Sequence, residues 1–210
     1  LKSIYQLTRE REPVATTAVA AALKVSPAAV TKMLRRLAHL RLVHHSRYRG
    51  VRLTPAGRRV ALEVVRHHRL LELYLSQALG YPLHRVHAEA EVLEHAISEE
   101  FEDSIDRLLG HPQLDPHGDP IPTRSGAVGK ALGAMLSQAK VGEKLVICRV
   151  LDNDVQLLRY LVSLGLVPQA TIEVTEKLPF GGPVKVRVSR TGAEHFIGQE
   201  AASSVFVERC

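Results

Sequence analysis

The sequence has few of the features that define secreted or membrane-spanning proteins. It contains two cysteines, no tryptophan and 4% aromatic residues. No apolar run approaches the roughly 20 residues needed to cross a bilayer, and no signal peptide is visible. We therefore expect neither a disulfide-stabilised fold nor a membrane partner, and the scarcity of cysteine favours a reducing, cytoplasmic location. At 210 residues the chain is long enough for about two or three small domains.

Charge is distributed unevenly along the chain. Residues 1–69 hold 15 Lys and Arg against 3 Asp and Glu, whereas residues 70–122 hold 2 against 11. The overall net charge of +6 hides this contrast. A chain divided in this way indicates a basic module that binds a polyanion, followed by an acidic module that binds cations. An unevenly charged, solvated surface is the alternative, and it would have to account for both extremes at once.

The basic module has the pattern of a winged helix-turn-helix. Residues 14–24 are typical of a short helix that Thr16 or Thr17 could cap, and Ser26-Pro27 is a strong start signal for a second helix. Residues 42–54 then read as two short strands around Arg49-Gly50. We expect the second helix to enter the DNA major groove and the basic hairpin to contact phosphate or the minor groove, although a solvated basic face is the plainer alternative. The predicted DNA-binding residues are Ser26, Ala28, Thr31, Lys32, Arg35, Arg36, Arg47, Tyr48 and Arg49.

The rest of the chain is predicted to be helical first and then rich in β-strands. A long helix should begin at Thr54-Pro55 and end near Gly80, and after a break at Pro82 a second helix should run to about Leu109. Residues 110–129, rich in Gly, Pro and Asp, are typical of a linker. From Val141 onward, short β-type runs around one helical insertion predict a small β-barrel. The expected fold class is therefore mainly α with a small β-barrel domain.

The segment HAEAEVLEH, residues 87–95, places two histidines and two glutamates on one side of the second helix. On a helical wheel they fall within about a 100° sector beside the apolar stripe. His87 and Glu94 lie about 10.5 Å apart along the helix axis, so they cannot readily share one ion. Two neighbouring metal sites fit better, and ordinary ion pairs on a solvated face are the alternative. The first site would use Glu91, Glu94 and His95, and the second would use His87 with His68 and Glu72 of the preceding helix.

In order and spacing, these segments resemble the metal-dependent repressors of the diphtheria toxin repressor and manganese transport regulator family. LKSIYQL resembles the first helix of that family, SPAAVTKMLRRLAHLRLV its recognition helix, and SRYRGVRLTPAGR its wing. RHHRLLE and VHAEAEVLEHAISEE resemble its two metal-binding stretches, and DPHGDPIP resembles its linker. The resemblance implies a winged helix-turn-helix DNA-binding domain at 1–60, a helical metal-binding and dimerisation domain at 61–122, a linker at 123–140 and an SH3-like (FeoA-type) domain at 141–210.

The resemblance also implies an activity and its metal ligands. It implies a cytoplasmic homodimer that represses manganese or iron homeostasis genes by binding a palindromic, double-stranded DNA operator when metal is bound. The primary site would use Glu91, Glu94 and His95, with a further ligand from a position just before Leu1. The ancillary site would use His68, Glu72 and His87. The SH3-like domain would add Gln156 and, as the nearest match to an acidic ligand, Asn153 with Asp152 and Asp154 beside it. Two ions per subunit are implied. Mn²⁺ is favoured because iron-responsive members have a cysteine where this chain has Glu91, and Fe²⁺ is close behind.

Two other classes of function stay open at this point. A metal-dependent hydrolase would need an open coordination position, but the sequence has neither an H-E-x-x-H pattern nor a nucleophile constellation. A winged-helix regulator with an organic effector would leave the His and Glu residues as ion pairs. We favour a repressor without enzymatic activity, in which metal ties together ligands from separate helices. This would bias the dimer toward the spacing that reads two half-sites one DNA turn apart.

Overall fold

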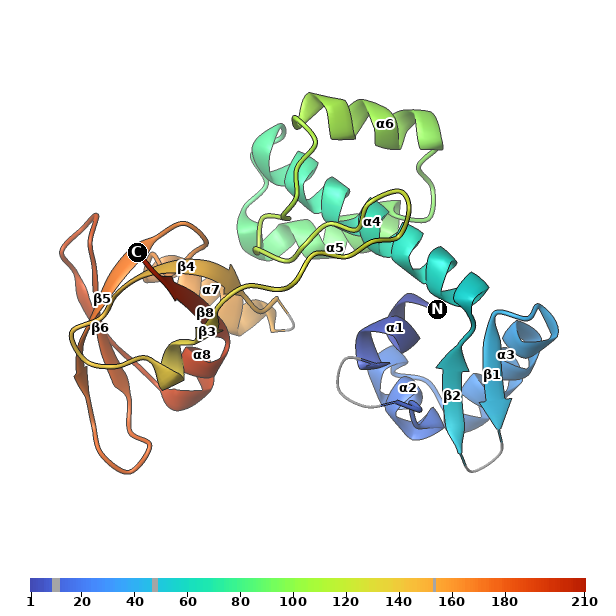
Figure 1. Ribbon diagram of the computed structural model, residues 1–210, viewed down its shortest axis with the longest axis horizontal. Coiled ribbons are helices and arrows are strands. Elements are labelled where there is room, and N and C mark those ends of the chain that lie inside the picture. The colour runs from blue at the N-terminus through green and yellow to red at the C-terminus, as the bar shows by residue number, and fades with distance from the viewer. Residues whose placement is uncertain (9–11, 47–48, 153) are drawn as a thin grey trace. The chain divides into compact units, whose positions relative to one another are not determined.

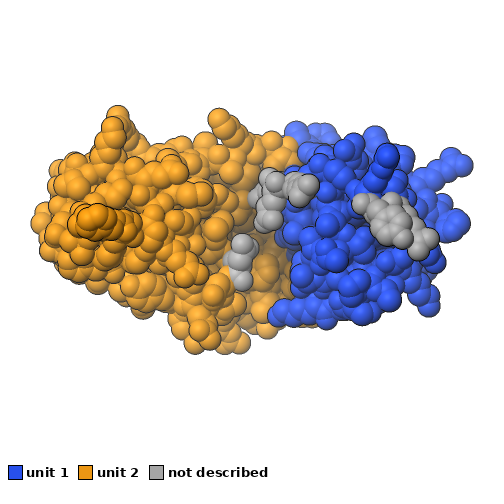
Figure 2. Space-filling model, turned by 90° about the horizontal axis from the view of Figure 1, so that it is seen from below, with its two compact units in different colours: residues 1–67, 122–127 blue, residues 68–121, 128–210 orange. Residues whose placement is uncertain are grey.

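The computed structural model describes residues 1–8, 12–46, 49–152 and 154–210 (Figure 1). These residues form two compact units: residues 1–67 with 122–127, and residues 68–121 with 128–210 (Figure 2). The long helix α4 (Pro55–Gln77) contributes residues to both units. No helix among the described residues is both long and apolar enough to span a membrane.

The first unit is a winged helix-turn-helix. It contains α1 (Lys2–Thr8), α2 (Thr16–Leu23), α3 (Pro27–His39), the hairpin strands β1 (Val43–Ser46) and β2 (Gly50–Leu53), and the first part of α4. Its core includes Ile4, Val30, Leu34 and Val51. Each such buried side chain stabilises the fold by about 1.5–3 kcal/mol relative to exposure. The strands β1 and β2 pair in antiparallel register, so the predicted hairpin is confirmed.

Side-chain caps explain where two of the helices begin. The Ser26 hydroxyl accepts a hydrogen bond from a backbone N–H of the first turn of α3 at 3.2 Å, and Pro27 is the first residue of that helix. The Thr54 hydroxyl accepts from the Gly57 N–H at 3.0 Å at the start of α4. Both caps satisfy donors that a helix start leaves open, so these predicted starts are confirmed. The predicted threonine cap of α2 is wrong, because Ala15 occupies the cap position.

The second unit begins with a group of helices: the rest of α4, α5 (Leu83–Leu93) and α6 (Glu99–Leu108). Apolar side chains of the three helices, among them Leu71, Val86 and Ile105, form one buried cluster. The single long helix predicted after Pro82 is wrong, because α5 ends at Leu93 and α6 starts after Ser98, whose hydroxyl caps it. Glu94 and His95, the last two predicted metal ligands of the segment 87–95, therefore follow the end of α5.

The C-terminal part of the second unit is a six-stranded antiparallel sheet in the order β3-β8-β4-β5-β6-β7 (Figure 1). Apolar side chains of its strands pack with Leu158 and Leu161 of α7 around one core. Among the described strands, β3 and β7 are not paired with each other, so the predicted β-barrel is an open sheet, while the mainly α class with a small β domain holds. The elements are β3 (Ala134–Met135), η1 (Leu136–Gln138), β4 (Lys144–Val150), α7 (Val155–Ser163), β5 (Thr171–Lys177), β6 (Val184–Val188), β7 (Glu194–Ile197), α8 (Gln199–Ser203) and β8 (Val205–Arg209).

Candidate metal centre

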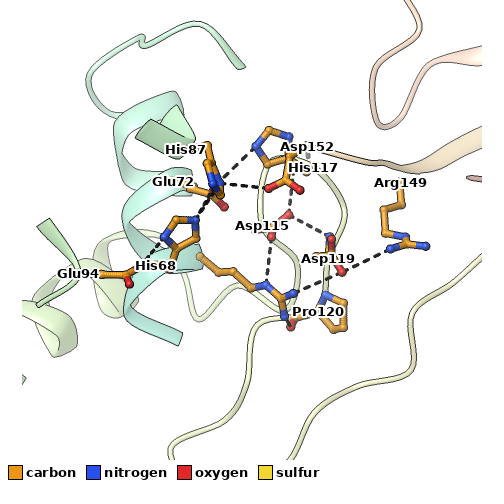
Figure 3. Close-up of polar contacts among 11 residues, drawn as sticks. His68, Glu72, His87, Glu94, Asp115, His117, Asp119, Pro120, Arg149 and Asp152 are labelled. Atoms are coloured by element: carbon orange, nitrogen blue, oxygen red, sulfur yellow. Dashed lines mark hydrogen bonds and ion pairs between the residues drawn. The ribbon is translucent and has the colours of Figure 1, made fainter. Parts of the chain in front are cut away.

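Successive turns of α4 place His68 and Glu72 on one side of the helix, where they meet His87 of α5 (Figure 3). The His68 Nε2 atom lies 2.9 Å from Glu72 Oε1 and 3.1 Å from His87 Nδ1. Glu72 Oε1 is itself 3.1 Å from His87 Nδ1. His68 and Glu72 are buried, so their polar atoms need partners within the protein. The fold thus brings together the three residues that the sequence assigned to an ancillary site.

The other ring nitrogen of His68 faces the end of α5. His68 Nδ1 lies 2.5 Å from Glu94 Oε2 and 3.8 Å from Glu91 Oε2. Glu94 is buried and directly follows the last residue of α5, whereas the side chains of Glu91 and His95 are 54% and 66% exposed. His95 Nε2 lies 3.3 Å from Glu94 Oε1. One imidazole therefore connects the two groups that the sequence assigned to separate sites.

Two further residues join the cluster from outside these helices (Figure 3). Asp152, just after β4, places its Oδ2 atom 3.2 Å from His87 Nδ1. His117, in the turn 115–120, places its Nε2 atom 3.8 Å from Glu72 Oε1. Ligand atoms of Glu72, His117 and Asp152 lie within 4.8 Å of one another, and a second group with this property is His68, His87 and Glu91. His117 is not among the ligands predicted from the sequence, because its surroundings are typical of a linker. The histidine between two aspartates in DPHGD is the signal that points to it.

Without a metal ion, the cluster holds a proton on His87. Hydrogen bonds to Asp152 and Glu72 raise the pKa of His87 to about 10. Burial acts to raise the pKa of Glu72, but hydrogen bonds from His68 and His87 outweigh it and lower this pKa to about 2. Burial also opposes ionisation of Asp152, yet the hydrogen bond from His87 holds its pKa below the usual range. A metal ion that binds through His87 must therefore displace a proton.

The surroundings of His117 show that the cluster suits a cation. The His117 side chain is fully buried, and neither ring nitrogen has a hydrogen-bond partner among the residues that the structure describes. Leaving a buried polar group unsatisfied costs about 1–3 kcal/mol, and coordination of a metal ion would remove this cost. Burial, reinforced by the nearby carboxylates of Glu72 and Asp119, raises the pKa of the Asp115 carboxyl well above its usual range. Carboxylate and imidazole donors that crowd together in this way fit a divalent cation such as Mn²⁺ or Fe²⁺.

Hydrogen bonds and close backbone packing fix the turn that carries His117. Asp115 Oδ1 accepts hydrogen bonds from the N–H groups of His117 and Asp119, each at 2.9 Å. A backbone N–H at the end of β4 donates to the His117 carbonyl at 2.9 Å. Gly118 has a φ of +91°, and a Cβ atom there would lie 1.9 Å from the Cys148 carbonyl oxygen. Only glycine therefore fits between this turn and β4.

Gly118→Ala should destabilise the protein by about 3 kcal/mol or more, because its new methyl group collides with β4 in addition to straining the backbone. Gly142→Ala is the matched control, since Gly142 has a φ of +86° but no described atom within 4 Å of where its Cβ would stand. The control should lose only the roughly 1–2 kcal/mol of a left-handed L-residue. Urea unfolding of both variants without metal checks this expectation, and equal losses would contradict it.

Those predicted DNA-binding residues that the structure describes lie on α3, at its N-cap, and in the turn between β1 and β2. Thr31 is half-buried, and its hydroxyl donates to the Pro27 carbonyl at 2.9 Å, which leaves it less available to a base. Arg47 and Tyr48 lie outside the described residues. The others are exposed, and their contacts with DNA stay predictions: Ser26, Ala28, Lys32, Arg35, Arg36 and Arg49.

Gln156 is not brought to the metal cluster. It is exposed in the first turn of α7, where its backbone N–H donates to Asp154 Oδ1 at 2.7 Å. Among the described hydrogen bonds, none joins its side chain to His87 or Glu72. Asp152 provides the contact from this segment instead. Asn153, the alternative candidate from the SH3-like domain, lies outside the described residues.

Comparison with known protein families covers all three parts of the chain. Residues 1–51 match the family described as "Iron dependent repressor, N-terminal DNA binding domain". Residues 54–123 match "Iron dependent repressor, metal binding and dimerisation domain", and residues 134–209 match "FeoA domain". The open sheet is therefore the FeoA domain, and the metal cluster draws most of its residues from the metal-binding and dimerisation domain.

Individual proteins give the same result, and two of the three matches described next extend over the whole of this chain. Iron-dependent repressor IdeR of Mycobacterium tuberculosis is 32% identical over 222 residues, covering 100% of this chain and 95% of that protein. Diphtheria toxin repressor of Corynebacterium glutamicum is 36% identical over 122 residues, which cover 58% of this chain and 54% of that protein. A solved manganese-dependent transcriptional repressor in complex with manganese is 38% identical, with a TM-score of 0.88 over 100% of this chain and 97% of that chain. Together with the cluster geometry, these matches show that the chain belongs to the diphtheria toxin repressor family of metal-dependent, DNA-binding transcriptional repressors, which are regulators and not enzymes.

Proposed function

We propose that this repressor responds to manganese in the cytoplasm and that two metal ions per subunit convert it to its operator-binding form. The observation that carries the proposal is the ligand set, which consists of carboxylate and imidazole donors, including Glu91. The resemblance to the family implies a cysteine at this position in iron-responsive members. Carboxylates suit Mn²⁺, whereas a thiolate would favour softer ions. The similar solved repressor is in complex with manganese. Fe²⁺ is the second candidate, because the similar protein IdeR is described as an iron-dependent repressor.

The two ions would occupy adjacent parts of the cluster. Glu91, Glu94 and His95 would hold the first ion at the end of α5, where His68 Nδ1 already faces Glu94. The second ion would lie among residues from α4, α5, the turn 115–120 and the segment after β4: Glu72, His87, His117 and Asp152. His68 Nε2 also borders this second group, so His68 could serve either ion.

The proposed switch follows from how many segments meet in the cluster. A bound cation would replace the proton on His87 as the positive charge between the carboxylates of Glu72 and Asp152, and it would thereby tie α4 to α5 and to the turn. Because α4 continues into the winged helix-turn-helix, fixing its C-terminal half would restrict how residues 1–60 are held in the dimer. Residues 61–122 would form the dimer contact, and the operator would be a palindrome with half-sites one DNA turn apart.

The test is DNA binding to the promoter of a metal-transport gene at fixed salt, because phosphate contacts make affinity strongly salt-dependent. The full chain is titrated with Mn²⁺, with Fe²⁺ under anaerobic conditions, and with EDTA. We expect Mn²⁺ to tighten binding by a factor typical of allosteric coupling, about 5–150-fold. Glu91→Ala should remove this response, because the carboxylate faces His68 at the first site.

Glu89→Ala is the matched control, since Glu89 lies on the same helix but contributes no ligand atom to either group of candidate ligands among the described residues. It should respond to Mn²⁺ like the unaltered chain. Equally tight binding in EDTA would show that metal does not control the repressor through this cluster. A response to Fe²⁺ but not to Mn²⁺ would overturn the choice of metal and leave the cluster in place.

A further inference from the structure

We propose that Arg69 and Arg149 are positioning residues that act through Asp119 to hold His117 at the second metal site. This inference rests on the proposed function, because it presupposes that His117 and its neighbours bind an ion. It adds residues that touch no metal ligand atom directly but fix the turn on which one ligand is carried. The charged network runs from α4 through the turn 115–120 to β4 (Figure 3).

Arg69, on α4, forms ion pairs and a hydrogen bond with the turn 115–120. Its Nε atom lies 3.3 Å from Asp115 Oδ2, and its Nη2 atom lies 3.4 Å from Asp119 Oδ1. Its Nη1 atom donates a short hydrogen bond to the Pro120 carbonyl. A planar guanidinium can make these three contacts at once because its N–H groups form a rigid fork. Arg69 directly follows His68, so the helix that supplies one metal-binding residue also holds the turn that supplies another.

Arg149 reaches the same carboxylate from the side of the sheet. Its Nη1 atom lies 3.6 Å from Asp119 Oδ1, and its guanidinium carbon lies 3.8 Å from the centre of the Phe206 ring of β8. Stacking on an aromatic face fixes the plane of the guanidinium and excludes water from it. Arg149 is three residues before Asp152, so the strand that positions Asp119 leads directly to a candidate ligand.

The ion pairs of this network are buried, so the loss of one partner should displace the others. The side chains of Arg69, Asp119 and Arg149 are each 11% exposed, and that of Asp115 is 3% exposed. Exposed ion pairs contribute little, but removing one partner of a buried pair leaves an uncompensated charge and displaces its neighbours. Asp119 carries the bridging carboxylate and lies two residues after His117. Neutralising Asp119 should therefore release the turn from Arg149 and leave Arg69 only its contacts with Asp115 and the Pro120 carbonyl. The turn is then held less tightly, and His117 can move away from Glu72 and Asp152.

The test is Asp119→Asn in the full chain, with Mn²⁺ and Co²⁺ binding measured by titration calorimetry and thermal unfolding measured without metal. Residues that orient metal ligands typically change affinity about 10–100-fold when altered. We expect a loss of this size at the second site only, with the affinity of the first site changed less than about twofold. Asp106→Asn is the control for an aspartate-to-asparagine change elsewhere, since Asp106 is largely buried like Asp119 but pairs with the exposed His111.

Two further variants separate the explanations. Asp119→Asn combined with Arg149→Gln should lose little more affinity than either single change, because both act on one pair. Equal weakening of both sites by Asp119→Asn would mean a general structural role and would overturn the proposal. If His117→Ala removes the second ion while Asp119→Asn leaves it bound tightly, the proposed positioning role is wrong, but His117 remains a ligand of the second metal site. If His117→Ala does not lower the metal stoichiometry, the second site itself is wrong, and the positioning role falls with it.

Discussion

Replacing His68 with glutamine should abolish the effect of metal on DNA binding, from a gain of about 5–150-fold to none. His68 is the residue on which the two parts of the cluster converge, since its Nδ1 atom faces Glu94 at 2.5 Å and its Nε2 atom faces Glu72 at 2.9 Å. Loss of this imidazole removes a donor from whichever ion it serves and breaks the link between the two groups. The measurement is operator binding with Mn²⁺ and with EDTA, together with the number of Mn²⁺ ions bound per subunit.

Glutamine is preferred to alanine because His68 separates two buried carboxylates. Glu72 and Glu94 are each 1% exposed, so His68→Ala would remove a hydrogen-bond donor from two buried carboxylates and destabilise this region. The glutamine amide can still donate a hydrogen bond, although it is a poor metal ligand. His111→Ala is the matched control, because His111 is 71% exposed and pairs only with Asp106 among the described contacts. A His68→Gln protein that is folded and still fully responsive to Mn²⁺ would show that the cluster is not the sensor.

The fold was largely predictable because most element boundaries have local chemical signals. Ser26-Pro27 and Thr54-Pro55 mark the starts of α3 and α4 as predicted. The split between α5 and α6 was missed, although Ser98 before a run of acidic residues has the character of a helix start. Amphipathic periodicity continues across this break, and periodicity alone does not show that the backbone leaves the helix. The strand β3 lies before the region predicted to be rich in strands and was missed, because two residues give too little pattern to read.

The metal cluster was predictable where its residues lie on α4 or at α5, including the meeting of His87 with His68 and Glu72. His68 with Glu72, and Glu91 with Glu94, have the spacing of neighbouring helix turns, and the structure places both pairs in one cluster. His117 belongs to a turn whose position depends on contacts with α4 and β4, which local sequence does not encode. Asp152 directly precedes Asn153, which the resemblance implied as a ligand, but the contact of Asp152 with His87 depends on how the sheet packs against α5. The ion pairs of Arg69 and Arg149 with Asp119 likewise depend on tertiary packing and could not be predicted from local sequence.

Replacing Arg35 and Arg36 together with alanine should weaken operator binding in the metal-loaded state and lower its salt dependence. Both side chains are exposed on α3, and the docking expected for a recognition helix places them near phosphates. Each phosphate that is no longer neutralised should reduce the slope of log affinity against log salt by about 0.9, so the double variant should reduce it by about 1.8. The loss of affinity should be nearly uniform across DNA sequences, because phosphate contacts carry no sequence information. Binding titrations at several salt concentrations, on operator and unrelated DNA, measure both effects.

Lys32→Ala makes the comparison sharper, because Lys32 lies one turn nearer the start of α3, where side chains face base edges. Removing a side chain that binds a base there should cost about 1–3 kcal/mol on the operator and relax discrimination between sequences, with a smaller change in salt slope. Lys130→Ala with Arg190→Ala removes the same formal charge as the double arginine variant from exposed positions of the second unit. If that control lowers the salt slope as much as the α3 variant does, net charge and not a docked helix governs the affinity. The predicted orientation of α3 requires three results. The control must leave the salt slope unchanged, the double arginine variant must lose affinity equally for all DNA sequences, and Lys32→Ala must lose affinity mainly for the operator.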